Sequence, residues 1–149
     1  QEKHGREVFF YEAGQAKQDA NYSEDRLHGE SRVYFENGEL ATVEYFEKGR
    51  KNGRDVDYTV NGSKTSDVNY WRGLKHGQEL LYFENGQIHE QLSYLFGQRN
   101  GVSKTFYASG SKKSETFYLD GIKHGISTSY GEDGTETLEV YDQGTNILE

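Results

Sequence analysis

A single period of 24 residues constrains this chain more than any other feature. A His-Gly or Asn-Gly pair returns at this spacing six times, from His4-Gly5 to His124-Gly125. Two further glycine columns follow the same period, so turn-forming residues stand at fixed places in each copy. We therefore interpret residues 1–149 as a single repeat domain. Its copies are 4–27, 28–51, 52–75, 76–99, 100–123 and 124–147.

The two ends of the chain depart from this pattern. In the last copy Tyr141 and Gly144 each arrive one position early, as expected of a terminal unit. Residues 148–149 carry none of the pattern, and we interpret them as a cloning remnant. The chain begins with Gln1 and contains no Met. This fits a secreted or periplasmic mature form, although the sequence does not fix the compartment.

Each copy predicts two β-strands, exemplified by the runs 30–35 and 39–46 on either side of Glu36-Asn37-Gly38. A two-residue loop would place Tyr34 and Phe46 on opposite faces. A three-residue loop with Gly38 in the left-handed conformation pairs residue 35 with residue 39, and we expect it to gather both aromatic columns on one face. The predicted fold is all-β: an elongated single-layer antiparallel meander of six stacked hairpins, about twelve short strands.

We expect the aromatic columns to be structural, each ring packing against its counterparts in neighbouring repeats, and the glycines to form turns. These structural positions are Tyr34, Phe46, Tyr58, Tyr70, Tyr82, Tyr94, Phe106 and Tyr118, with Gly29, Gly38, Gly53, Gly62, Gly77, Gly86, Gly101 and Gly110. The absence of Pro fits a chain whose N–H groups are used in strand pairing. No apolar run approaches the ~20 residues that a spanning helix needs, so we expect a soluble protein.

Three segments carry a family resemblance. Residues 118–125, Tyr-Leu-Asp-Gly-Ile-Lys-His-Gly, are followed by Tyr130 and by the turn Asp133-Gly134, and residues 70–77 and 94–101 match the same pattern. This pattern resembles the MORN repeat (membrane occupation and recognition nexus). The standard unit carries another Gly two residues after the His-Gly pair, which this chain lacks. The chain is more similar to the longer bacterial variant, whose members are often labelled antitoxins or phosphoinositide-kinase-like. The resemblance implies an all-β scaffold that contacts a protein or a lipid.

Catalysis and metal binding have little support in the sequence. Successive members of the His column lie two strands apart, about 9.6 Å, so they cannot share one ion whose ligand nitrogens must lie ~2 Å from it. Cys is absent, and no nucleophile motif such as Gly-x-Ser-x-Gly appears. Carboxylates on a single-layer sheet are expected to stay hydrated, with ordinary pKa values. We therefore predict a non-enzyme with no catalytic residues, no metal and no cofactor.

Two sets of residues are candidates for binding. A second group of aromatic residues is expected on the face opposite to the structural columns, where it would suit a protein partner. It consists of Tyr11, Phe35, Tyr45, Trp71, Phe83, Tyr107 and Phe117. A basic ridge of Lys51, Lys75, Arg99 and Lys123, each directly before a His/Asn-Gly pair, is the alternative site, for an anionic membrane lipid or cell-surface polymer.

Among partners, the sequence favours a protein. An antitoxin-like inhibitor of a partner toxin is one form of that prediction. The net charge of −8 argues against nucleic acid. Strands at the two ends of the sheet also leave self-association through unpaired edges open.

Overall fold

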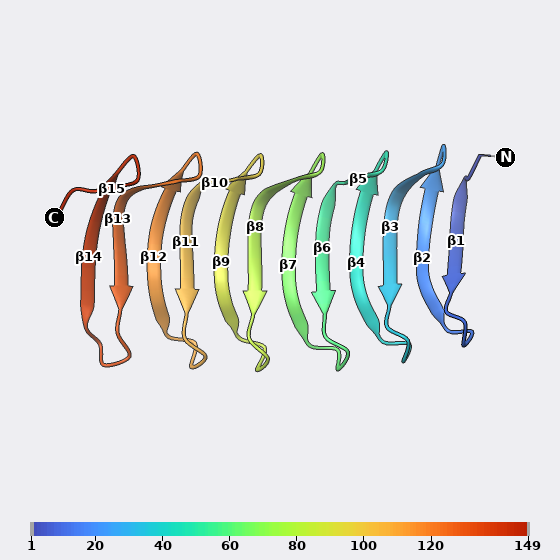
Figure 1. Ribbon diagram of the computed structural model, residues 1–149, viewed down its shortest axis with the longest axis horizontal. Coiled ribbons are helices and arrows are strands. Elements are labelled where there is room, and N and C mark those ends of the chain that lie inside the picture. The colour runs from blue at the N-terminus through green and yellow to red at the C-terminus, as the bar shows by residue number, and fades with distance from the viewer. Residues whose placement is uncertain (1, 149) are drawn as a thin grey trace. The chain divides into compact units, whose positions relative to one another are not determined.

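The computed structural model describes residues 2–148, which form β-strands joined by turns, without a helix in that range. Glu149, half of the suspected terminal remnant, lies outside the described residues. The chain divides into two compact units, one ending at Leu74 and the other starting at Lys75. Within each unit the strands follow one another as a single-layer antiparallel meander (Figure 1). The predicted all-β hairpin fold is therefore confirmed.

The first unit contains seven strands. They are β1 (Gly5–Phe10), β2 (Ala16–Ser23), β3 (Arg26–Tyr34), β4 (Leu40–Glu47), β5 (Arg50–Lys51), β6 (Gly53–Tyr58) and β7 (Lys64–Trp71). Each pairs with the next in space in the order β1-β2-β3-β4-β6-β7, while the short β5 pairs with the end of β4. β1 pairs only with β2 in the described chain, so its outer edge has the free backbone groups that could pair with another chain.

The second unit repeats this plan. Its first strand, β8 (Leu74–Tyr82), begins with the last residue of the first unit. The strands that follow are β9 (Ile88–Leu95), β10 (Gln98–Arg99), β11 (Gly101–Phe106), β12 (Lys112–Leu119), β13 (Ile122–Tyr130), β14 (Glu136–Asp142) and β15 (Thr145–Asn146). The short β10 pairs with β9, and β15 pairs with the end of β14. The extra strands relative to the twelve predicted arise from β5, β10 and β15. In Figure 1 each of them runs along an edge of its own unit, across the direction of the long strands.

The predicted three-residue loops are present along one edge, here called the long-turn edge. The N–H of Phe35 donates to the carbonyl of Glu39 at 2.8 Å, and the N–H of Gly38 donates to the carbonyl of Phe35 at 2.9 Å. Gly38 has a φ of +87°, a conformation in which a side chain would be strained. The same pair of bonds recurs from Tyr11 to Gly131, once in each copy.

The prediction that both aromatic columns share one face is wrong. Tyr34 pairs with Leu40, but Val33 pairs with Thr42, so Ala41 is an extra residue in β4. Such a bulge shifts the alternation of side chains by one position. Phe46 therefore pairs with Gly29 and lies on the face opposite to Tyr34. The loop prediction was right, and this second bulge reversed its consequence.

The shortened last copy locates this bulge independently. From Gly125 opposite Tyr141 to Tyr130 opposite Glu136, β13 and β14 pair without a register shift. The residue missing from the last copy is thus the bulge residue. Its loss leaves the hairpin intact, because a bulge residue makes no ladder pair of its own.

The His/Asn-Gly pairs form bends within the sheet, whereas turns were predicted. Gly29 has a φ of +87° and lies inside β3. There Ala20 pairs with Ser31 and Tyr22 pairs with Leu27, which leaves three residues of β3 opposite one of β2. Gly53 follows the same rule with a φ of +126°, and a Cβ there would lie 3.0 Å from the Cβ of Tyr45. The glycine column therefore permits both the bend and a close approach between strands.

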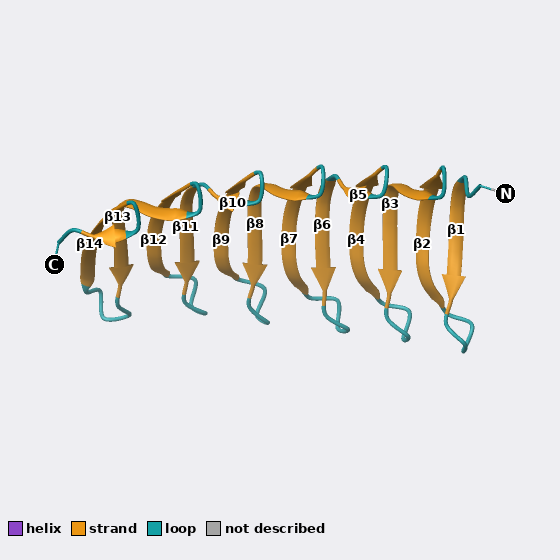
Figure 2. Ribbon diagram, turned by 45° about the horizontal axis from the view of Figure 1, so that its top comes forward, coloured by secondary structure: helices purple, strands orange, loops and turns teal. Residues whose placement is uncertain are grey.

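The opposite edge, the short-turn edge, is made of two-residue turns. At Lys48-Gly49 both residues have positive φ, 50° and 78°, as a type I′ hairpin turn requires. The turn glycine also binds the preceding repeat: the N–H of Gly73 donates to the carbonyl of Lys51 at 2.7 Å, and that of Gly97 to the carbonyl of Lys75 at 2.8 Å. Figure 2 shows these turns along the edge that carries β5 and β10. Each turn is thereby fixed to its neighbour.

Candidate interaction surface

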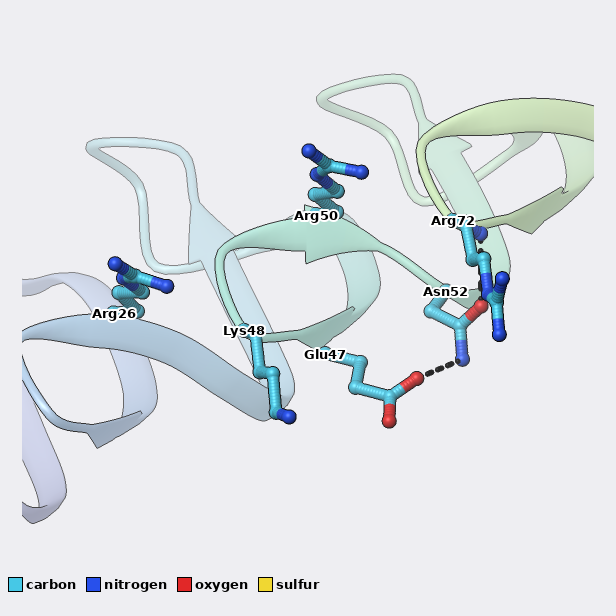
Figure 3. Close-up of a pocket in the computed structure, with 6 residues that line it drawn as sticks. All are labelled: Arg26, Glu47, Lys48, Arg50, Asn52 and Arg72. Atoms are coloured by element: carbon cyan, nitrogen blue, oxygen red, sulfur yellow. Dashed lines mark hydrogen bonds between the residues drawn. The ribbon is translucent and has the colours of Figure 1, made fainter.

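The short-turn edge of the first unit holds a shallow cavity of about 410 Å³. Its lining residues are Arg26, Glu47, Lys48, Arg50, Asn52 and Arg72 (Figure 3). The Asn52 amide donates to the Glu47 carboxylate at 3.0 Å, and its oxygen accepts from the N–H of Arg72 at 3.0 Å. Four cations and one carboxylate thus line the cavity. The sequence analysis did not single out this group, because its members fall at two different positions of the repeat.

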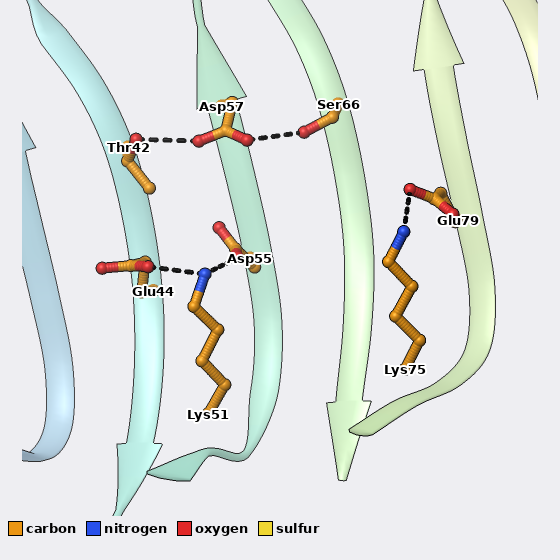
Figure 4. Close-up of polar contacts among 8 residues, drawn as sticks. All are labelled: Thr42, Glu44, Lys51, Asp55, Asp57, Ser66, Lys75 and Glu79. Atoms are coloured by element: carbon orange, nitrogen blue, oxygen red, sulfur yellow. Dashed lines mark hydrogen bonds and ion pairs between the residues drawn. The ribbon is translucent and has the colours of Figure 1, made fainter. Parts of the chain in front are cut away.

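The predicted basic ridge has a different environment from the one expected. Lys51 folds back over the sheet, where its Nζ lies 2.7 Å from Glu44 and 2.5 Å from Asp55 (Figure 4). It also lies 5.2 Å from the centre of the Tyr70 ring. In the second unit, Lys75 Nζ lies 2.6 Å from Glu79 and 5.1 Å from the Tyr94 ring centre. We call the face over which these chains fold the covered face.

The other two ridge residues repeat this geometry without a carboxylate. Arg99 lies 5.2 Å from the Tyr118 ring centre, and Lys123 lies 4.6 Å from that of Tyr141. Each also approaches the hydroxyl of the same tyrosine, at 3.4 and 3.3 Å. The sequence predicted that these rings pack against one another between repeats. Instead, a cation lies over each of Tyr70, Tyr94, Tyr118 and Tyr141. Such a cation–π contact contributes about 0.5–1 kcal/mol at partly exposed sites.

Beneath these cations lies a row of buried polar side chains. Asp55 is 5 % exposed and Glu79 6 %, and one carboxylate oxygen of each has no hydrogen-bond partner. Burial raises the pKa of Asp55 above its ordinary value, although the hydrogen bond from Lys51 opposes this. For Lys51, burial lowers the pKa, but hydrogen bonds to Asp55 and Glu44 outweigh it and raise the pKa overall. The lysine therefore stays charged and holds its carboxylates in the sheet.

Asp57 continues the polar row without a cation. Its two carboxylate oxygens accept hydrogen bonds from Thr42 and Ser66, both at 2.8 Å (Figure 4). Three adjacent strands, β4, β6 and β7, are thus joined by side chains as well as by backbone pairing. Satisfied polar ladders of this kind fix the strand register.

The predicted aromatic binding set divides into two groups. Tyr11, Phe35, Phe83 and Tyr107 are half-buried at the long-turn edge. The Tyr11 hydroxyl donates to the carbonyl of Tyr34 at 2.7 Å, and the Tyr107 hydroxyl to that of Tyr130 at 2.8 Å. Phe83 contacts the His89 ring at 4.5 Å between centroids. Tyr11, Phe83 and Tyr107 therefore take part in contacts between repeats or within the loop.

Tyr45, Trp71 and Phe117 are more exposed, at 39 %, 41 % and 36 %. Tyr45 donates its hydroxyl to Glu30 at 2.5 Å, and Trp71 lies beside the Arg72 guanidinium, 4.4 Å from the ring centre. Tyr45 and Phe117 belong to the face opposite to the covered one, which we call the open face. The structure therefore brings only part of the predicted set to an accessible surface.

Ion pairs across strands occupy much of the open face. Arg6 forms a bidentate pair with Asp19, at 2.7 and 2.6 Å, and Arg54 pairs in the same way with Asp67. Hydrogen bonds from these guanidinium groups lower the pKa of both carboxyls below their ordinary value. In the second unit Lys112, 2.7 Å away, lowers the pKa of Glu115. These charges are already partnered within the sheet.

An apolar patch interrupts these charges in the second unit. Val102 pairs directly with Phe117, and Ile126 and Leu138 lie on the two strands that follow. Their exposed fractions are 42 % for Val102, 36 % for Phe117, 63 % for Ile126 and 58 % for Leu138. Sequence reasoning found only Phe117. The other three could have been found by applying the alternation of side chains in the corrected register.

Residues 2–148 contain no group of three or more His, Asp or Glu side chains placed to hold a metal ion. No helix long and apolar enough to cross a bilayer occurs there.

Comparison with known proteins agrees with the repeat geometry. The sequence model of the MORN repeat variant matches four segments, residues 3–24, 27–48, 75–95 and 99–120. Together these segments cover more than half of the chain. No curated protein matches the sequence.

Proposed function

This chain belongs to the MORN repeat variant family, and we propose that it works as a non-catalytic scaffold that binds another protein. Repeats of this family mediate interactions with proteins or membranes. The observation that carries the proposal is the apolar patch of Val102, Phe117, Ile126 and Leu138. These side chains are 36–63 % exposed on a sheet face that is otherwise rich in ion pairs. A contiguous apolar patch with a charged rim is typical of a protein interface.

The environment of the titratable groups supports a binding role over a catalytic one. Shifted pKa values mark functional sites when the group is left to act on a ligand. Here the shifted carboxyls of Asp19, Asp67 and Glu115 are held by cations of the same sheet, and Asp55 is held by Lys51. Ion pairing within the repeat array accounts for the lowered pKa values of Asp19, Asp67 and Glu115, and burial accounts for the raised pKa of Asp55.

The alternative, an anionic lipid or polymer bound through the basic ridge, has weaker support. Lys51 and Lys75 would have to leave their carboxylates and tyrosine rings to reach such a ligand. Removing the cation from a buried pair leaves an uncompensated carboxylate, which is strongly unfavourable. Lys51 and Lys75 are therefore better placed to stabilise the sheet than to bind a ligand at its surface.

The test compares two double variants of the full chain. Phe117→Gln with Ile126→Gln removes the centre of the patch, while Val8→Gln with Phe10→Gln changes two apolar residues of the first unit, 37 % and 63 % exposed. Proteins captured from the host extract are identified, and the candidate partner is purified and titrated against each variant. We expect the patch variant to bind at least tenfold more weakly and the control variant to bind normally. Equal binding by both variants would rule out the patch as the interface.

An antitoxin-like role is the narrower form of the proposal. It requires that the partner be a protein whose harmful activity stops on binding. Co-expression of partner and chain should then restore growth that the partner alone prevents, and the patch variant should fail to restore it. A partner that is harmless to cells would exclude this narrower role but leave the scaffold role standing.

A further inference from the structure

The cations of the short-turn edge differ from Arg6 and Arg54 of the same unit in lacking an ion-pair partner among residues 2–148. Arg6 and Arg54 each hold a carboxylate across the sheet. No carboxylate of the described chain lies within ion-pair distance of Arg26, Lys48 or Arg50, and Glu47 is engaged by Asn52. These three cations line the cavity without an ion-pair partner in the part of the chain that the structure describes, and the one carboxylate of the lining, Glu47, accepts a hydrogen bond from the Asn52 amide instead. The chain as a whole is strongly acidic, so this local concentration of positive charge is not a consequence of composition.

The backbone fixes the spacing of these cations. Arg26 begins β3 and Arg50 begins β5, and both strands pair with β4. The two residues are thus two strand spacings apart, about 9.6 Å. Figure 3 shows both side chains extending to the same side of their turns. Lys48 and Arg72 form a second pair with the same 24-residue separation, and their side chains extend to the opposite side (Figure 3).

Glycine keeps the arginine stems in place. A Cβ at Gly49 would lie 3.6 Å from the Cβ of Arg26, and one at Gly73 would lie 3.8 Å from that of Arg50. Each stem therefore rests against the turn of the next repeat. Backbone bonds from the same two glycines to the preceding repeat, at 2.8 and 2.7 Å, hold those turns in register. The result is a pre-arranged pair of guanidinium groups.

A 9.6 Å repeat selects among the conformations of an acidic peptide. In an extended strand, side chains on one face recur every two residues, about 6.7 Å apart. In a polyproline II helix, side chains on one face recur every three residues, and three rises of about 3.1 Å give about 9.3 Å. Acidic residues at every third position of such a helix thus match the arginine spacing. Guanidinium groups bind carboxylates through two parallel hydrogen bonds.

We propose that Arg26 and Arg50 bind an acidic polyproline II segment that carries a carboxylate at every third residue. This inference rests on the proposed scaffold function and names the chemistry of one part of the partner. The net charge of −8 disfavours long polyanions, whereas a short segment meets only the local cations.

Two fluorescein-labelled peptides of equal composition test the proposal by fluorescence anisotropy with the full chain. One is (Glu-Pro-Pro)₄, and the other holds the same residues with the four Glu contiguous. We expect the periodic peptide to bind several-fold more tightly and its affinity to fall as salt is raised. Arg26→Gln with Arg50→Gln should weaken its binding about tenfold, because each exposed ion pair contributes a factor of up to about five.

The control removes two other exposed cations, Lys17→Gln with Lys113→Gln, and should leave the affinity unchanged. Unaltered far-UV circular dichroism and thermal midpoint would verify that both variants fold. Equal binding of the two peptides, equal effects of the two double variants, or no binding would each overturn the proposal. So would binding of phosphatidylserine vesicles through Arg26 and Arg50 without binding of the peptide. Partner capture by the apolar-patch variant is measured in a separate experiment. A failure of the peptide to bind would therefore overturn the arginine site without overturning the scaffold function.

Discussion

Replacing Lys51 with Met tests whether this cation stabilises the sheet or is free to bind a ligand. The ammonium group contacts Glu44 at 2.7 Å and Asp55 at 2.5 Å, and the side chain is 34 % exposed. The two carboxylates are better shielded, with side-chain exposures of 16 % and 8 %. Met preserves the length and the apolar stem, so the substitution removes the charge with little change in packing.

The expected cost follows from this intermediate burial. Breaking an exposed ion pair costs up to about 1 kcal/mol, and breaking a buried one about 3–5 kcal/mol. A cation one-third exposed, shared between two shielded carboxylates, should fall between these limits. We therefore expect Lys51→Met to lower the free energy of unfolding by about 2 kcal/mol. The neighbouring Arg50→Met, which breaks no ion pair, should change it by less than about 0.5 kcal/mol.

Urea unfolding followed by circular dichroism measures both variants. Asp55→Asn provides the second arm of a double-mutant cycle: once the buried charge is gone, Lys51→Met should cost about 1 kcal/mol less than in the parent chain. If Lys51→Met proves as mild as Arg50→Met, the lysine is solvated. The basic column would then be free for an external anion, and the structural argument made for it would be refuted.

Three further outcomes are expected. Gly53→Ala should lower the free energy of unfolding in urea by about 3 kcal/mol, because φ is +126° and the added Cβ would meet the Tyr45 side chain. Gly62→Ala, with a φ of +80° and open space around the added Cβ, should lower it by about 1 kcal/mol. Equal costs would contradict the close approach between strands at Gly53. Because Arg54 lowers the pKa of Asp67 in the folded state, the stabilisation from this pair is complete above the ordinary pKa of 3.8 and is lost as pH falls through the folded pKa. Asp67→Asn should therefore reduce the loss of folding stability that the protein shows as pH falls. An unchanged pH dependence of the free energy of unfolding would contradict the role of this ion pair. Gln143→Asn should raise the free energy of unfolding by about 0.5 kcal/mol, because Asn tolerates the φ of 47° in this type I′ turn better than Gln does. A higher midpoint of thermal unfolding would show this. An unchanged midpoint would contradict the turn assignment.

The glycine columns made the repeat plan predictable. Positive φ at Gly38 and the three-residue loop follow from residue types that few other conformations tolerate. The residues around Ala41 do not themselves indicate the bulge, because an alanine fits a bulge and a regular ladder equally well. Only the missing residue of the last copy pointed to it. The faces of the aromatic columns depended on that one residue and were therefore assigned wrongly.

The fate of the basic column was equally hard to foresee. Lys51 and Lys75 look like edge residues in a flat hairpin, and only the bend at the following His/Asn-Gly pair turns their side chains over the sheet. A residue-by-residue pattern does not contain the direction of that bend. The acids four residues further on, Asp55 and Glu79, were the available clue, since a Lys and an acid on adjoining parts of a bent strand can meet.

The bond from Gly73 to the carbonyl of Lys51 has a consequence for how such chains change in length. Each repeat supplies the donor that its predecessor lacks, so a cut inside a copy leaves an acceptor without its partner on one side and a donor on the other. Duplication or loss of one complete period restores every such pair. Insertions or deletions of complete 24-residue periods are thus the length changes that preserve these bonds.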